Sequence, residues 1–151
     1  MTSLEFRRDD ALSSDALAMI AESEAEQAAI YPPEVRYAFS PEQLTRAKVR
    51  FLTVYREGVL AGCGGVAPCA GFAELKRIYV TRSERNKGIA GRIVGALEEI
   101  ARDDRFALMR LETGLASPDA LALYRKHGYR EIAAFGDYRE NGSSVFMEKA
   151  L

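Results

Sequence analysis

The chain of 151 residues is 48% hydrophobic and 28% charged, and residues 1–151 are expected to form one domain with its own core. A net charge of −1 and the lack of an apolar run of roughly 20 residues predict no nucleic-acid partner and no membrane partner. Two cysteines, one histidine and an N-terminus without an apolar core predict a cytoplasmic protein with no disulfide framework and no bound metal.

The first part of the chain is expected to contain one strand and two helices. Apolar and polar residues alternate over 4–8, which predicts a strand. Apolar residues that include Leu17 recur at helical spacing over 14–30, and two consecutive prolines then end that helix. A short helix is expected at 41–47, because Ser40 can cap it and a proline occupies its first position.

The rest of the chain alternates between strand and helix patterns. Strands are expected at 50–55, 59–67, 72–80, 108–113, 129–135 and 143–149. Helices are expected at 88–102 and 118–126. The predicted element order is therefore β-α-α-β-β-β-α-β-α-β-β, in a chain without repeats or a linker.

The segment Arg85-Asn86-Lys87-Gly88-Ile89-Ala90 follows a predicted strand and opens a predicted helix. The first turn of a helix has unpaired backbone N–H groups and the positive end of the helix dipole, so it attracts anions. Five cations between residues 76 and 87 would add a local basic patch. The expected ligand is a phosphate or pyrophosphate, although the segment is neither a Walker loop nor a Rossmann glycine motif.

Three segments together resemble the GNAT superfamily of acyl-CoA-dependent N-acyltransferases. The loop at 85–90 is similar to its Arg/Gln-x-x-Gly-x-Gly/Ala motif, and Phe72–Val80 lies where the family has its preceding strand. Leu123–Tyr129 is similar to its Leu-Tyr-x-x-x-Gly-Phe/Tyr signature. The resemblance covers residues 50–132 well. It implies an α/β fold, with a mixed, mostly antiparallel central sheet flanked by helices.

The resemblance also implies that acetyl-CoA is the cosubstrate, with no metal, and that the chain is a monomer or a homodimer. The pyrophosphate would lie on the loop, and the main chain of the preceding strand would hold the pantetheine arm. The cofactor-binding residues implied are Ile78, Tyr79, Val80, Arg85, Asn86, Lys87, Gly88, Ile89, Ala90 and Tyr124. Asn86 departs from the family's usual glycine, but asparagine tolerates positive φ better than most residues.

Acetyl transfer to a primary amine needs a group that takes the amine's proton and a group that protonates the leaving thiolate. The resemblance suggests Glu74 as the general base, although a glutamate there could equally lie on an exposed strand face. Glu112 and Glu34 are lesser candidates for the base, and alternation along the strand of Glu112 could direct that residue away from the site. Tyr124 is the expected general acid, and its alternative is a core tyrosine on an amphipathic helix.

The acceptor side is less constrained by the sequence. Candidate substrate-binding residues are Tyr31, Glu34, Glu112 and Tyr138, of which Glu34 and Tyr138 could bind a cationic amine. The acceptor is a small molecule, a peptide or a protein. One alternative function is an acyl-CoA-binding regulatory module without turnover. Another is a transferase of a longer acyl group such as succinyl, whose carboxylate Arg36 or Arg139 could bind.

Overall fold

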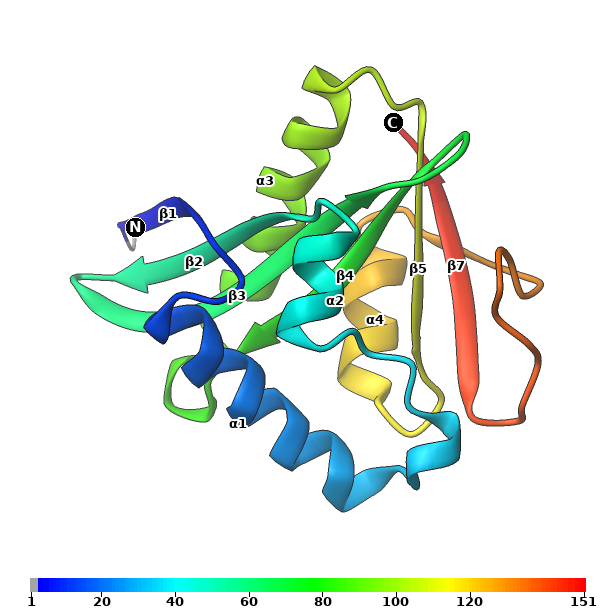
Figure 1. Cartoon of the computed structure of the whole chain (residues 1–151), viewed down its shortest axis with the longest axis horizontal. Helices are drawn as coiled ribbons and strands as arrows, with labels where there is room; N and C mark the ends of the chain where they lie inside the picture. The colour runs from blue at the N-terminus through cyan, green and yellow to red at the C-terminus, as the bar shows by residue number, and fades with distance from the viewer. Residues whose placement is uncertain (1–2) are drawn as a thin grey trace.

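The computed structural model describes residues 3–151, and these form a seven-stranded sheet in the order β1-β2-β3-β4-β5-β7-β6 (Figure 1). The strands are β1 (Leu4–Asp9), β2 (Arg50–Arg56), β3 (Val59–Pro68), β4 (Ala73–Val80), β5 (Leu108–Gly114), β6 (Arg130–Ile132) and β7 (Ser144–Ala150). The helices are α1 (Ser14–Ile30), η1 (Pro33–Val35), α2 (Pro41–Arg46), η2 (Arg82–Glu84), α3 (Ile89–Asp103) and α4 (Pro118–Lys126). Only β4 and β5 pair in parallel, so the mixed and mostly antiparallel sheet predicted from the family resemblance is confirmed.

The predicted element order is confirmed, and the helix starts have the expected caps. The hydroxyl of Ser13 accepts a hydrogen bond from the main chain of Ala16 at the start of α1. Ser40 and Gln43 form a reciprocal capping box at the start of α2. The one-turn helices η1 and η2 were not predicted, because three residues are too few to show a periodic pattern.

Two details of the prediction are wrong. Leu17 does not belong to the buried face of α1; it is 41% exposed, and the helix instead buries Ala16, Met19, Ile20 and Ser23. The strand expected at 129–135 is only three residues long. Beyond Ile132 the chain leaves the sheet, where the side chain of Glu140 accepts a hydrogen bond from the main-chain N–H of Ala134.

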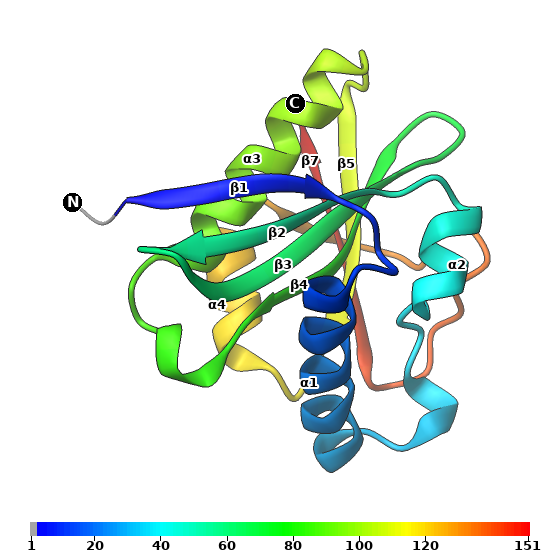
Figure 2. The ribbon, with the colours of Figure 1, turned by 60° about the vertical axis from the view of Figure 1, so that its left-hand side comes forward.

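Helices cover both faces of the sheet (Figure 2). One core lies under α3 and α4, and it includes every residue of the predicted apolar face of α3: Ile89, Ile93, Val94, Leu97 and Ile100. A second core lies under α1 and α2 on the opposite face, where Met19, Ile20 and Leu44 pack against Phe51. The sheet is therefore the middle layer of three.

The strands β4 and β5 separate soon after they meet. They pair only at their first residues, Ala73 with Met109 and Glu74 with Arg110, and the rest of β4 has no ladder on that side (Figure 1). On its other side β4 carries a bulge against β3, where Arg77 has a φ of 56°. Because a bulge bends its strand and increases the local twist, it helps to turn β4 away from β5. The gap leaves Ile78, Tyr79 and Val80 without ladder partners in β5, and the main-chain oxygen of Val80 instead accepts a hydrogen bond from the Arg85 side chain at 2.9 Å.

Candidate active site

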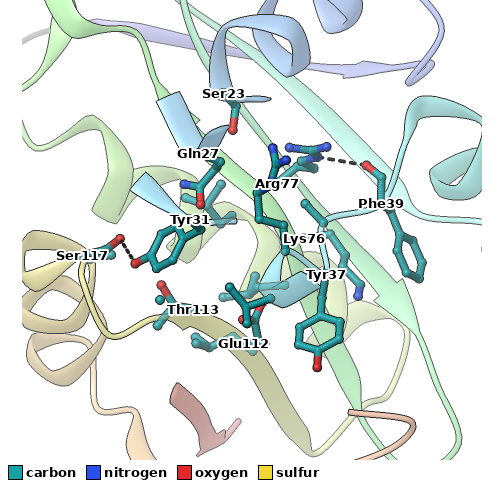
Figure 3. A pocket seen from close by; sticks show the side chains of 18 of the residues that line it. Ser23, Gln27, Tyr31, Tyr37, Phe39, Lys76, Arg77, Glu112, Thr113 and Ser117 are labelled. Carbon is teal, nitrogen blue, oxygen red and sulfur yellow. Dashed lines mark hydrogen bonds between the residues drawn. The ribbon is translucent and has the colours of Figure 1, made fainter. Parts of the chain in front are cut away.

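A cavity of about 180 Å³ lies where β4 and β5 diverge (Figure 3). Its wall comes from α1, the segment between α1 and α2, β4, β5, α4 with its N-cap, and the loop before β7. On one side, the hydroxyls of Tyr31 and Ser117 are hydrogen-bonded at 2.9 Å. On another side, the guanidinium of Arg77 donates to the main-chain oxygen of Phe39 at 2.9 Å. Segments far apart in the sequence therefore meet around one space.

Glu74 lies in this wall and is only 6% exposed, so it is not a surface glutamate. The ammonium of Lys76, two residues along the same strand face, pairs with its carboxylate at 2.8 Å. The hydroxyl of Tyr138 donates a hydrogen bond to the same carboxylate, and burial together with that negative charge raises the pKa of Tyr138. Lys76 also lies 3.9 Å from the ring centroid of Phe39, so its charge is held by several partners.

Glu112 also lines the cavity, and the expectation that strand alternation could direct it away is wrong. Its neighbour Leu111 is buried in the core under α3 and α4. Alternation along β5 therefore places Glu112 on the opposite face of the sheet, on the α1 side of a cavity whose wall includes residues from both faces. The hydroxyl of Ser144 donates a hydrogen bond to the Glu112 carboxylate at 2.7 Å, and burial raises the pKa of this group. Within the described residues Glu112 forms no ion pair.

Tyr124 reaches the cavity from α4 and is 7% exposed. Its hydroxyl has no hydrogen-bond partner within residues 3–151, and burial, followed by the charge of Glu112, raises its pKa. After the helix, Gly128 has a φ of 92°, which lets the chain turn so that the rings of Tyr124 and Tyr129 meet edge to face at 5.8 Å. The Tyr-x-x-x-Gly-Tyr motif thus orients the tyrosine toward the cavity.

The loop before α3 has the backbone expected of an anion site. Gly88 is the N-cap of α3 with a φ of 75°, and no side chain caps the first turn, so its N–H groups have no side-chain acceptor. Asn86 has a φ of 64°, the positive value that its place in the motif requires.

The cations of this region, in contrast, do not form the expected basic patch. Arg85 binds both carboxylate oxygens of Glu26 at 2.7 and 2.8 Å, and Lys87 pairs with Glu84 at 2.7 Å. Upstream, Lys76 pairs with Glu74 and Arg77 pairs with Glu24. These four charges are therefore largely compensated, and the anion-binding capacity of the loop rests mainly on the main chain of α3.

The family follows from comparison with known proteins. A family model described as "Acetyltransferase (GNAT) family" matches residues 16–129. The chain belongs to the GNAT acetyltransferase family. An "IAA acetyltransferase" of Azospirillum brasilense is 31% identical over the full length of both chains. A relative from Bacillus subtilis, named only as an uncharacterized N-acetyltransferase, is 28% identical over 98% of this chain and all of its own length.

Solved structures share the GNAT fold. A putative acyl-CoA N-acyltransferase from Klebsiella pneumoniae matches with a TM-score of 0.83 and 29% identity, covering 98% of this chain and 97% of its own. The PaiA N-acetyltransferase from Thermoplasma acidophilum, solved in complex with coenzyme A, matches with a TM-score of 0.78 and 23% identity over 99% of both chains. By family and by its relatives, this chain is an N-acetyltransferase.

The remaining acceptor-side candidates of this GNAT chain lie in different places. Tyr31 lines the cavity, and a Cβ on Gly114 would fall 1.8 Å from its hydroxyl, so this tyrosine requires a glycine opposite it. Tyr138 lies in the Glu74 network. Glu34 is exposed on η1 and is not part of the cavity wall. The hydroxyl of Tyr79 lies 2.7 Å from a carboxylate oxygen of Glu26 and 3.1 Å from one of Glu22, so its side chain is held by α1.

Sequence reasoning missed two features of the site. The first is the pairing of Lys76 with Glu74, for which their i, i+2 spacing on one strand face was the available signal. The second is the set of glutamates on α1 that hold Arg77 and Arg85, and their spacing gave no indication of partners in β4 and the loop.

Two further observations concern residues 3–151 only. Nowhere in this part of the chain do three His, Cys, Asp or Glu side chains come together as a metal site would require. None of its helices combines the length and the apolar character needed to cross a membrane.

Proposed function

We propose that this chain transfers the acetyl group of acetyl-CoA to a primary amine by direct attack, with Glu74 as general base and Tyr124 as general acid. The observation that carries the proposal is that a buried carboxylate from β4 and a phenol from α4 line one cavity, at the point where β4 leaves β5. Beyond this point β4 has no strand partner on the side of β5, and such an edge suits the amides of a pantetheine arm acting as a pseudo-strand.

The proposed substrate path has two ends. The pyrophosphate of acetyl-CoA binds the first turn of α3, where the free N–H groups and the helix dipole favour negative charge. The pantetheine arm then follows Val80, Tyr79 and Ile78 toward the cavity. Neither the loop at 81–88 nor α3 contributes to the cavity wall, so the cavity itself is available to the thioester and the acceptor.

The reaction needs a neutral amine, because only an unprotonated nitrogen can attack the thioester carbonyl. A lysine-like amine has a pKa of about 10.4, so roughly one molecule in a thousand is neutral at pH 7. As the C–N bond forms, the base takes the amine's proton, and the electron pair of the broken C–S bond leaves on sulfur. A base inside the cavity therefore offsets part of the cost of deprotonation.

The role of Tyr124 follows from its burial. Because its pKa is raised, the phenol stays protonated through the neutral range and remains a donor. Complete proton transfer to a thiolate, whose ordinary pKa is about 8.5, is correspondingly unfavourable. We therefore propose that Tyr124 acts chiefly by donating a hydrogen bond to the sulfur as negative charge develops there.

Glu112 is a second candidate for the base. The charge of Glu74 is already balanced by Lys76 at 2.8 Å, whereas Glu112 has only the Ser144 hydroxyl as a close partner. Burial raises the pKa of Glu112, which makes it a stronger base once it is ionised. Glu112 also lies close enough to Tyr124 to influence the pKa of that phenol.

The pH dependence of two variants separates these roles. If Glu74 is the base, Glu74→Gln should lose activity at neutral pH and recover as the pH approaches the amine's own pKa, because neutral amine then becomes abundant. If Glu112 is the base, Glu112→Gln should behave in this way instead. The acidic limb of the wild-type kcat/KM profile should then lie above the pH range of an ordinary carboxyl group, because the raised pKa of Glu112 delays its ionisation until higher pH. Profiles of kcat/KM from pH 6 to about 10 measure this.

Glutamine at either position keeps an oxygen that can accept the Tyr138 or Ser144 hydrogen bond. Glu74→Gln leaves Lys76 without its counter-charge, so thermal unfolding of each variant is measured first. A raised KM with an unshifted profile in Glu74→Gln would mean that this residue binds the acceptor and is not the base.

Release of free thiol from acetyl-CoA over a panel of amines tests the proposed activity. The panel holds amino acids, polyamines, small aromatic amines and lysine peptides. IAA is included because the Azospirillum relative carries it in its name. We expect amine-dependent thiol release from at least one class. Acetyl-CoA binding without release from any of them would favour the regulatory module, and faster release from succinyl-CoA would favour the longer acyl donor.

A further inference from the structure

The charged groups of the cavity wall are almost all paired with one another. They are Glu24, Arg36, Glu74, Lys76, Arg77 and Glu112. Lys76 is held by Glu74, and Arg77 by Glu24 together with the main chain of Phe39. Each of these two cations therefore has a hydrogen-bonded carboxylate within the protein. Arg36 and Glu112 are the cation and the carboxyl group of this wall that have no hydrogen-bonded partner of opposite charge, since Arg36 has only a long ion pair with Glu24 at 3.8 Å.

Arg36 follows η1 in the segment that joins α1 to α2, and its side chain is 23% exposed. Its nearest carboxylate oxygen belongs to Glu24 and lies 3.8 Å from Nη1, which is beyond hydrogen-bond distance. Its Nε is buried and has no hydrogen-bond partner among residues 3–151. A guanidinium carries five N–H donors in a planar fork, and burying them unused is unfavourable. A ligand in the cavity can use the outer donors of this fork.

We propose that Arg36 binds a carboxylate of the acceptor, so that the acceptor is an amine that also carries a carboxylate, as an amino acid does. This proposal rests on the proposed acetyl transfer to an amine. A guanidinium recognises a carboxylate through two parallel N–H···O bonds, which gives geometry as well as affinity. A zwitterion would meet the two groups of the wall that lack a hydrogen-bonded counter-charge, with its carboxylate on Arg36 and its amino group toward Glu112.

The charge balance argues against a simple cationic acceptor. A polyamine would bring several positive charges to a wall that already holds three cations, and of the three carboxyl groups there Glu24 and Glu74 are already paired with those cations. An amine that carries its own negative charge avoids that repulsion.

Matched acceptors test this directly. Thiol release from acetyl-CoA is measured with the proteinogenic amino acids, their carboxamides and the corresponding decarboxylated amines. We expect kcat/KM to fall about tenfold to a hundredfold from an amino acid to its carboxamide, as loss of a charge-assisted pair predicts. Arg36→Gln should reduce that preference to within about threefold, and Arg36→Lys should retain part of it, because lysine keeps the charge without the fork.

Arg46→Gln is the matched control, because Arg46 is exposed in the last turn of α2 and does not line the cavity. It should keep the wild-type preference. Equal or better turnover of carboxamides and polyamines by the wild type would overturn the proposal. A different outcome is that the wild type acylates carboxamides with succinyl-CoA and loses that activity in Arg36→Gln. This result would mean that Arg36 binds the carboxylate of the acyl donor, and it would overturn the acceptor assignment.

A binding measurement separates failure of this proposal from failure of the proposed function. The same amino acids are titrated by calorimetry into protein saturated with coenzyme A. If no amine supports thiol release but an amino acid binds to the wild type and not to Arg36→Gln, acetyl transfer fails and the carboxylate site stands. If no amino acid binds or reacts, the carboxylate site is wrong, whatever other amine is acetylated.

Discussion

Replacement of Tyr124 by phenylalanine should lower kcat by roughly 100-fold with little change in KM, which is within the range typical for loss of one proton donor. The hydroxyl stabilises charge that appears on sulfur only in the transition state, so its loss raises the barrier without weakening ground-state binding. The ring keeps its place, because phenylalanine preserves the edge-to-face contact with Tyr129. The hydroxyl gives up no hydrogen bond to any described residue, so the fold should be unaffected. Steady-state kinetics with saturating acetyl-CoA measure the effect.

Tyr129→Phe is the control for this variant. The hydroxyl of Tyr129 donates to the buried carboxylate of Glu98 at 2.8 Å, which Lys149 also binds. Its removal should lower the free energy of unfolding by about 1–2 kcal/mol and leave kcat nearly unchanged. If kcat of Tyr124→Phe stays near the wild-type value, the tyrosine has no part in the mechanism, and water then protonates the thiolate.

Replacement of Gly88 by valine should weaken acetyl-CoA binding by about tenfold or more. Gly88 has a φ of 75°, a conformation that a β-branched residue adopts only at a cost of about 1–3 kcal/mol. Each 1.4 kcal/mol corresponds to a factor of about ten in affinity. No atom lies within 4 Å of the position a Cβ would take, so the side chain would occupy open space at the start of α3. That space is where the pyrophosphate is proposed to bind, and calorimetric titration with acetyl-CoA measures the loss.

Gly71→Val separates backbone strain from obstruction of the pyrophosphate site as the cause of weaker binding. Gly71 has a φ of 85° and equally open surroundings, but it lies before the first residue of β4, at the opposite end of that strand from the loop. It should cost similar stability and leave acetyl-CoA affinity unchanged. Arg85→Ala should weaken binding only a few-fold, because Glu26 already compensates much of this charge. Unchanged affinity in Gly88→Val would remove the loop from the binding site.

Much of the fold was predictable because its signals are local. The residues of the predicted apolar face of α3 recur at helical spacing, and all five are buried. The capping box of α2 needs only four consecutive residues, Ser40 to Gln43. The prediction was wrong where tertiary contacts decide the outcome. Leu17 fits a helical pattern, but the sheet lies under a neighbouring stripe of α1. The strand at 129–135 contains suitable residues, but only its first part is paired with β7.

The site was partly predictable for the same reason. The positive φ of Gly88 and Asn86 and the place of Tyr124 before Gly128 belong to short motifs, so they could be anticipated from the residues. Burial of Glu74 could not, because strand alternation alone does not say which face of β4 meets other parts of the chain. Strand alternation likewise does not decide the orientation of Glu112. The tertiary structure decides it, because Leu111 is buried in the core under α3 and α4 and Glu112 therefore lies on the other face of β5.

By itself the sequence determined the elements, the left-handed turn at the start of α3 and the motif segments that indicated the GNAT family. Only the tertiary structure decided how the charges are distributed. Arg77 meets Glu24 and Arg85 meets Glu26 across more than 50 residues of chain, so no local pattern relates these partners. The same pairing leaves Glu112 without an ion pair among residues 3–151 and leaves Arg36 with only a long one, to Glu24 at 3.8 Å. Electrostatic interactions depend on distance in space, and the folding of α1 against β4 sets those distances.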